Sequence, residues 1–145
     1  MLRLTKRYPF SASHRLHTAK LSEEENQRLF GKCNNPYGHG HNYTLEVSVE
    51  GVADEQSGMI LARPVLDRIV ERAVLSKIDH ADLNSDVEDF HDVVPTTENL
   101  ALLIDRWMRA EWSREFAGRP VRLSRIRVEE TARNSFEVTN GTHDA

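Results

Sequence analysis

The 145-residue sequence has a single cysteine and no long apolar run. One cysteine cannot form a disulfide within the chain, so Cys33 is expected to be a reduced thiol in a cytoplasmic protein. A membrane span needs about 18 consecutive apolar residues, and no such stretch occurs. The opening residues, MLRLTKRYPF, also lack the apolar core of a signal peptide. We therefore expect a cytoplasmic protein that has no membrane partner.

Neither sign of charge dominates the composition. The net charge is -4 and no basic block stands out, which argues against a nucleic-acid partner. An anionic substrate would need positive charge supplied locally. The length and the 39% of hydrophobic residues fit one domain, which we place at residues 1–139. Residues 140–145 are expected to form a mobile polar tail.

Four segments alternate apolar and polar residues, which is the pattern of half-buried strands. The third segment changes phase after Leu123, and a bulge near Ser124 would reconcile its two halves. The fourth segment is short. The strands are expected at residues 2–14, 42–50 and 121–130, and around Phe136 and Val138.

Two other segments have the period of amphipathic helices. The first runs from about Pro64 to Lys77, and the second begins near Thr96 or Thr97 with a threonine cap. The polar stretch between them is expected to be irregular. Further upstream, Ser22 could cap a short helix in a capping box with Glu25. The predicted order is strand, strand, helix, helix, strand, strand, an α+β fold.

Three histidines are predicted to face the same interior. The alternation of the second strand, extended backwards, puts His39 and His41 on its apolar face, about 6.5 Å apart along the backbone. His14 ends the apolar face of the first strand. Three histidines without a thiolate or carboxylate at ligand spacing are typical of a catalytic zinc that keeps its fourth position open. The alternative is three ordinary buried histidines.

A second candidate group consists of Cys33, Asp79 and His80. A thiol becomes a base or a nucleophile when a histidine or a cation lowers its pKa, and an aspartate can orient the imidazole. A small buried cysteine and a helix-terminating turn are the alternatives for the two halves of this group. Glu130 is a third candidate, because the phase change turns it toward the core. A buried carboxylate needs donors, which a guanidine-like ligand or an arginine of the same chain could supply.

Several motifs together resemble the 6-pyruvoyl-tetrahydropterin synthase family, which also contains 6-carboxy-tetrahydropterin synthases. The resemblance extends from Phe10 to about Val138. It rests on FSASHRL, LSEEENQRLFGKCNNPYGHGHNY, DHADLN, VVPTTEN and VEET, in that order.

The resemblance implies a tunnelling fold, in which a four-stranded antiparallel sheet carries two helices on one face. Three such sheets would form a barrel, and two trimers would stack into a homohexamer with active sites between subunits. It further implies that 7,8-dihydroneopterin triphosphate loses its triphosphate and rearranges to 6-pyruvoyl-tetrahydropterin. No nicotinamide cofactor would be needed.

The resemblance also implies roles for individual residues. Zn²⁺ would be bound by three histidines, Cys33 would be the general base, and a carboxylate would anchor the pterin. Arg15 and Lys32 are our candidates for the triphosphate, and a solvated surface position is the alternative for each. By residue, the implied sites are His14, His39 and His41 for zinc; Cys33, Asp79 and His80 for proton transfer; and Glu130, with Thr96, Thr97 and Glu98, for the pterin ring.

Two other functions stay open at this point. A 6-carboxy-tetrahydropterin synthase of the 7-deazaguanine (queuosine) route uses the same substrate, but its cysteine usually lies nearer the His-x-His pair. Five residues separate Cys33 from His39 here, which favours the pyruvoyl type. The sequence departs from the animal-type pattern at Tyr37, Pro95 and Arg133, which leaves the choice between the pyruvoyl and carboxy products open. A zinc-stabilised oligomer that binds pterins without converting them is the alternative of another class.

Overall fold

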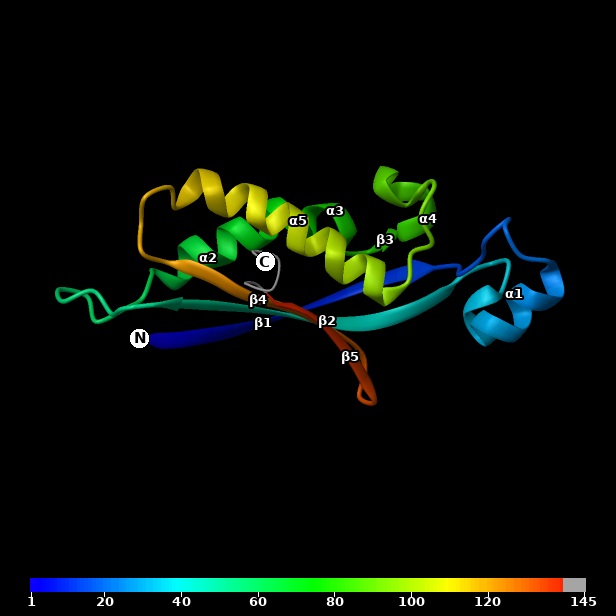
Figure 1. The fold of residues 1–145 in the computed structure, drawn as a ribbon, viewed down its shortest axis with the longest axis horizontal. Helices are drawn as coiled ribbons and strands as arrows, with labels where there is room; N and C mark the ends of the chain where they lie inside the picture. The colour runs from blue at the N-terminus through cyan, green and yellow to red at the C-terminus, as the bar shows by residue number, and fades with distance from the viewer. Residues whose placement is uncertain (140–145) are drawn as a thin grey trace, which may run out of the picture.

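The computed structural model describes residues 1–139, and the tail expected at 140–145 lies outside the described residues. One sheet organises the chain. Its two long helical runs, residues 63–78 and 97–115, lie on one face, and the short helix at residues 23–30 lies beyond one end of the sheet (Figure 1). The strand order is β3-β1-β2-β4-β5. The strands are β1 (Leu2–His14), β2 (His39–Gly51), β3 (Ala81–Asp82), β4 (Arg122–Thr131) and β5 (Asn134–Thr139).

Two helical runs cover the sheet, as the periodicity predicts. The first is α2, which continues through a π-helical turn η2 into α3, and the second is α5, which Thr96 caps by accepting from the Asn99 amide at 3.2 Å. Short helices lie outside these runs. The helical elements are α1 (Glu23–Phe30), η1 (Gly31–Asn34), α2 (Arg63–Val70), η2 (Glu71–Leu75), α3 (Ser76–Ile78), α4 (Leu83–Asp86), η3 (Glu88–Phe90) and α5 (Thr97–Glu115).

The expected four-stranded antiparallel sheet is wrong in its strand count. The four long strands do pair antiparallel, but β3 adds a fifth strand, parallel to β1. The reason is local: His80 adopts a φ of 63°, and its amide donates to Ser11 O at 2.6 Å, which turns the chain along the outer edge of β1. The stretch expected to be irregular therefore contains β3, α4 and η3.

The helix-facing side of the sheet holds the core. Leu45 and Val47 of β2 are fully buried in one cluster with Leu66 of α2 and Leu103 of α5. Burying each such side chain contributes about 1.5–3 kcal/mol relative to exposing it. The alternation of apolar residues thus determines which side of each strand the helices cover.

The bulge in β4 lies where the phase change predicts it. Arg125 pairs with Ser48 but Leu123 pairs with Val49, so Ser124 is the extra residue. Glu130 consequently faces the helices, whereas its neighbour Glu129 lies on the other side of the sheet.

The opposite face of the sheet is charged. Glu46, whose side chain is only 8% exposed, forms ion pairs with Arg7, Arg125 and Arg127. Polar pairs such as Thr5 with Ser48 continue this face. No apolar layer is needed to cover it.

The short helix α1 begins with the predicted capping box. Ser22 Oγ accepts from the Glu25 amide at 3.1 Å, and the Glu25 carboxylate accepts from the Ser22 amide at 3.0 Å. Among residues 1–139, no helix is both long and apolar enough to cross a membrane.

Candidate active site

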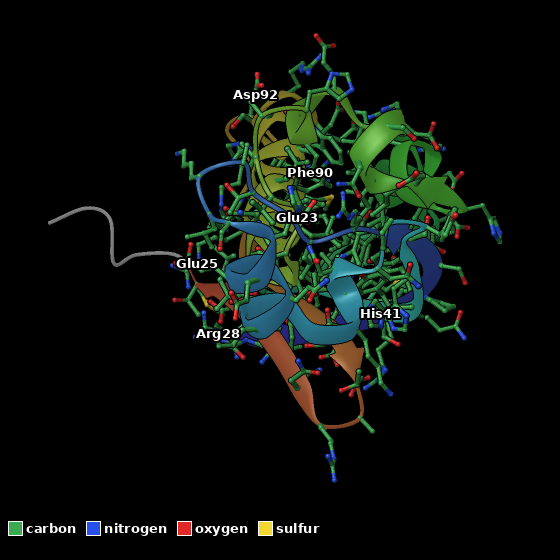
Figure 2. The ribbon with its side chains drawn as sticks, turned by 90° about the vertical axis from the view of Figure 1, so that its right-hand side faces the viewer. Glu23, Glu25, Arg28, His41, Phe90 and Asp92 are labelled. Carbon is green, nitrogen blue, oxygen red and sulfur yellow. The ribbon has the colours of Figure 1, made fainter. Side chains whose placement is uncertain are left out.

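The three histidines gather at the end of the sheet where β1 finishes and β2 begins. In the antiparallel register His14 lies opposite His39, and Ala12 lies opposite His41. The ring of His41 lies edge-on to both other rings, with centroids 5.0 Å from His14 and 4.6 Å from His39. Figure 2 views this end of the molecule, with α1 in the foreground and His41 labelled.

His14 is arranged as a neutral nitrogen ligand. It is fully buried, and its Nδ1 lies 2.9 Å from Pro95 O, so the carbonyl holds the Nδ1–H tautomer. Nε2 then carries a lone pair, and it has no hydrogen-bond partner within the described residues. Burial lowers the pKa of His14, against the hydrogen bond to Pro95, which raises it. A buried, neutral imidazole with one orphaned nitrogen fits a metal ion.

Cys33 reaches the histidines from η1. Its carbonyl accepts from the Leu16 amide at 2.7 Å, and the neighbouring Asn34 side chain donates to Leu16 O at 2.8 Å. These bonds tie η1 to the chain just beyond β1. Burial, and secondarily the carboxylate of Glu130, raises the pKa of the Cys33 thiol.

The ligand atoms of His14, Cys33 and His41 all lie within 4.8 Å of one another. Like His14, His41 has a buried Nε2 without a hydrogen-bond partner in the described part of the chain, and burial lowers its pKa. Two imidazole nitrogens and a thiol are a donor set suited to zinc and similar cations. The structure thus brings together two of the three predicted histidine ligands with the predicted base.

His39 lies beside this group and borders an open pocket. The pocket has a volume of about 650 Å³ and is also lined by Arg15, Lys32 and Glu23. Arg15 is held in place, because its Nε donates to Asn34 O at 3.1 Å. The two basic residues that the sequence suggests for the triphosphate therefore lie on the same cavity as a predicted zinc ligand.

Glu130 lies on the other side of the histidines. Its Oε2 accepts a hydrogen bond from Thr97 Oγ1 and lies 4.0 Å from His41 Nε2, while its Oε1 accepts from Asn134 Nδ2 at 3.0 Å. Burial alone would raise the pKa of Glu130, but the hydrogen bonds from Thr97 and Asn134 hold it below its usual value. The carboxylate is therefore kept ionised and oriented. No arginine of the described chain pairs with it, unlike the alternative considered from the sequence.

The three other residues predicted to contact the pterin differ in burial and in hydrogen bonding. Thr97 is buried and contacts Glu130, whereas Thr96 is occupied in capping α5. Glu98 is exposed in the first turn of α5.

Asp79 and His80 do not join Cys33 within one chain. Asp79 Oδ1 accepts from the Ser11 amide at 3.0 Å, on the outer edge of β1, and lies 3.7 Å from His80 Nε2. The His80 side chain is 82% exposed. Across residues 1–139, no hydrogen bond or ion pair links either residue to Cys33.

Two contributors to the site were missed from the sequence. The carbonyl of Pro95 fixes the tautomer of His14, and Asn134 holds Glu130. A proline carbonyl has no side-chain signal. Asn134 has the weak signal of a polar residue four positions after the candidate carboxylate Glu130, in the turn between two strands.

Comparisons with known proteins agree on one family. The family model described as 6-pyruvoyl tetrahydropterin synthase matches residues 3–141. A 6-pyruvoyl tetrahydrobiopterin synthase of Poecilia reticulata is 45% identical over 132 residues, covering 90% of this chain and 85% of the relative. Its Homo sapiens counterpart is 50% identical over 101 residues, 70% of each chain. The solved structure of Caenorhabditis elegans 6-pyruvoyl tetrahydropterin synthase, 36% identical, superposes with a TM-score of 0.85 over 97% of this chain and 96% of that one.

Proposed function

The chain belongs to the 6-pyruvoyl tetrahydropterin synthase family, and on this basis we propose that it converts 7,8-dihydroneopterin triphosphate into 6-pyruvoyl-tetrahydropterin. The reaction eliminates triphosphate and rearranges the side chain by internal redox, so it needs no external reductant. The observation that carries the proposal is the convergence of Cys33 on His14 and His41, within 4.8 Å. A thiol at this place suits proton transfer, which a pterin-binding protein without catalysis would not require.

The proposed metal is Zn²⁺, bound by His14, His39 and His41. Support comes from the two orphaned Nε2 atoms of His14 and His41, and from the ring of His39 beside them. When bound, the ion would polarise the hydroxyls of the substrate side chain and acidify the adjacent C–H bond. The carbonyl of Pro95 keeps the His14 ring in the orientation that this requires.

Cys33 is the proposed general base. Its thiolate would take the proton from the acidified carbon and return it to the neighbouring carbon during the rearrangement. Burial and the carboxylate of Glu130 both raise the pKa of this thiol in the isolated chain. We therefore propose that a cation or a residue of another chain activates it. Asp79 and His80, on the outer edge of β1, are proposed to complete the relay in a neighbouring subunit of a homohexamer.

Glu130 is the proposed pterin anchor. An oriented carboxylate can accept two parallel N–H bonds, one from the 2-amino group and one from the adjacent ring nitrogen. Thr97 and Asn134 already hold both of its oxygens. We propose lesser ring contacts for Thr96 and Glu98.

The triphosphate is proposed to occupy the pocket bordered by Arg15, Lys32 and His39. The volume of about 650 Å³ accommodates it, and one of the three predicted zinc ligands, His39, lines the pocket. Glu23 on the same pocket limits the positive charge there, so a cation accompanying the triphosphate would assist binding. The cytoplasmic location expected from the lone cysteine stays a prediction.

Identification of the product tests the function directly. Zinc-loaded protein is incubated with 7,8-dihydroneopterin triphosphate, and the pterin product is identified by mass spectrometry. The pyruvoyl product supports the proposal, and a carboxy product would replace it with the related activity. The Cys33→Ala protein should bind the metal but lack turnover. Full activity in that variant would overturn the role of the thiol.

A complementation experiment tests the relay between subunits. Cys33→Ala and His80→Ala proteins should each be inactive alone. When the two are unfolded, mixed and refolded together, some sites combine an intact Cys33 with an intact His80 from different chains. Recovery of activity on mixing is the expected result, and no recovery in well-folded mixed oligomers would contradict a site built from two chains.

A further inference from the structure

Cys33 has a setting that a base alone would not require. A base needs to reach the substrate carbon, but the Cys33 sulfur also lies within 4.8 Å of the ligand nitrogens of both His14 and His41. Among residues 1–139, the ligand atoms that converge belong to His14, Cys33 and His41. His39 lies beside this group, where its ring contacts the ring of His41.

A second observation at the same place points to a ligand. His14 is 0% exposed, yet its Nε2 has no hydrogen-bond partner, and His41 Nε2 is buried without one as well. An unpaired buried polar atom costs about 1–3 kcal/mol, so two of them side by side indicate a missing partner. The Cys33 thiol is the third polar group facing that space.

The backbone holds Cys33 in this position. The bond from the Leu16 amide to Cys33 O fixes η1 against the residue two positions after His14, and the Asn34 side chain adds a second bond to Leu16 O. The closeness of the sulfur to His14 is therefore a property of the local fold. Zinc bonds of about 2.0 Å to nitrogen and 2.3 Å to sulfur place tetrahedral ligands roughly 3.5 Å apart. Small side-chain rotations would bring the three atoms to that spacing.

We propose that Cys33 is itself a metal ligand in the substrate-free protein, beside His14 and His41, and that it gives up this place when the substrate side chain binds. This inference rests on the proposed function, because it assigns a resting state to the same base. With His39 as a further ligand, the substrate-free site would have four protein ligands, the number of a closed zinc site.

The proton balance of this arrangement is simple. When Cys33 coordinates a divalent cation, the thiol proton passes to solvent and the sulfur donates an electron pair. When Cys33 leaves, it keeps that pair and departs as a thiolate. It is then ready to accept a proton from the substrate carbon, and no separate base is needed to ionise it. The sulfur would also shield the site from other ligands until a pterin arrives.

Cobalt provides a direct readout of sulfur ligation. Co²⁺ occupies zinc sites, and a thiolate ligand gives it a charge-transfer absorption in the near ultraviolet that nitrogen and oxygen ligands do not give. Cobalt is added to metal-free wild-type protein, to Cys33→Ser and to His39→Ala. The serine variant is the matched control, because it keeps the size of the side chain and removes only the sulfur.

The wild-type and His39→Ala proteins should show the charge-transfer band, and Cys33→Ser should lack it. Cobalt affinity should fall at least about 10-fold in Cys33→Ser, since even the loss of an outer-shell partner costs that much. Neopterin, the oxidised pterin with the same trihydroxypropyl side chain, is then added to the cobalt-loaded wild type. It should diminish the band as the sulfur leaves.

The outcomes separate this inference from the proposed function. If zinc- or cobalt-loaded wild type forms the pyruvoyl product but the cobalt-loaded protein has no band, Cys33 is a base that never coordinates, and the inference is wrong. If the band is present and neopterin does not diminish it, the sulfur is a permanent ligand and the displacement is wrong. If the band responds to neopterin but no product forms, the ligand assignment stands and the proposed function is wrong.

Discussion

Replacing Thr97 by valine tests how the site orients Glu130, the proposed pterin anchor. Thr97 is 3% exposed, and its hydroxyl donates to Oε2 of Glu130. Valine has nearly the same shape but offers a methyl group instead of the hydroxyl. Helix α5 should keep its first turn, because Thr96 rather than Thr97 caps it. The substitution therefore removes one hydrogen bond from the carboxylate and little else.

The size of the effect follows from the setting of Glu130. A hydrogen bond to a charged group contributes about 1.5–3 kcal/mol. The Glu130 side chain is 17% exposed and keeps the bond from Asn134, so the lower part of that range applies. A loss of about 1.5–2 kcal/mol corresponds to a 10- to 30-fold decrease in kcat/KM. On the proposal that Glu130 holds the pterin ring equally in the ground state and the transition state, KM should carry most of the change.

Steady-state kinetics with 7,8-dihydroneopterin triphosphate measure this effect. Thr97→Ser is the matched control, since it retains the hydroxyl and should stay within about threefold of wild type. If Thr97→Val also stays within threefold, the hydroxyl does not orient Glu130 and the reasoning fails. A fall in kcat alone would assign Thr97 to the chemical step instead of binding.

Three further predictions concern stability and the metal. Glu46→Ala leaves Arg125 and Arg127, both largely buried, without their shared carboxylate, and should lower the free energy of unfolding by about 2–4 kcal/mol in urea denaturation at fixed protein concentration. As the control, Glu137→Ala removes only the exposed ion pair with Arg125, at 3.8 Å, and should lower the free energy of unfolding by less than about 0.5 kcal/mol. If the two variants lose equal stability, the ion pairs of Glu46 are no stronger than an exposed pair. Burial lowers the pKa of His14, so the unfolded chain binds more protons below about pH 6.5, and thermal denaturation should show the metal-free protein losing stability as the pH falls from there. His14→Phe should flatten that dependence, and an unchanged slope would show that His14 does not cause it. Chelation should abolish turnover and added zinc should restore it, measured against a mock-treated sample; turnover that survives complete metal removal would exclude a metal role.

The parts of the fold that depend on periodicity were predictable from the sequence. The even parity of β1 puts His14 on the helix side, and the parity of β2 does the same for His41. The phase change in β4 locates the bulge at Ser124 and turns Glu130 toward the histidines. These inferences succeed because side chains alternate strictly along a strand, so one buried face determines every second residue.

The position of Cys33 depends on contacts that periodicity does not encode. Its place beside the histidines comes from a bond between the Leu16 amide and the Cys33 carbonyl, in a loop and a short 3₁₀ turn. The same limit applies to β3, which exists because one backbone angle at His80 turns the chain. Asn134 meets Glu130 only through the register of β4 and β5. To predict the positions of Cys33, β3 and Asn134, one would need the path of the backbone through a loop or turn. The sequence gives only residue preferences for such segments.

His80 has an unfavourable backbone conformation and a largely exposed side chain. Its φ of 63° is in the left-handed region, which costs a residue other than glycine about 1–2 kcal/mol. The imidazole is 82% exposed, and its Nε2 lies 3.7 Å from Asp79 Oδ1. Glycine would adopt this turn without the steric cost, although its greater freedom in the unfolded chain offsets about 0.4–1 kcal/mol. His80→Gly should therefore leave the free energy of unfolding unchanged or slightly higher, while His80→Ala, which keeps the steric cost, should not raise it. Both variants should lose turnover if the imidazole serves Cys33 of another subunit. Retained turnover in the glycine variant would contradict the role of the imidazole in another subunit. A loss of stability above about 1 kcal/mol in that variant would contradict this account of the turn.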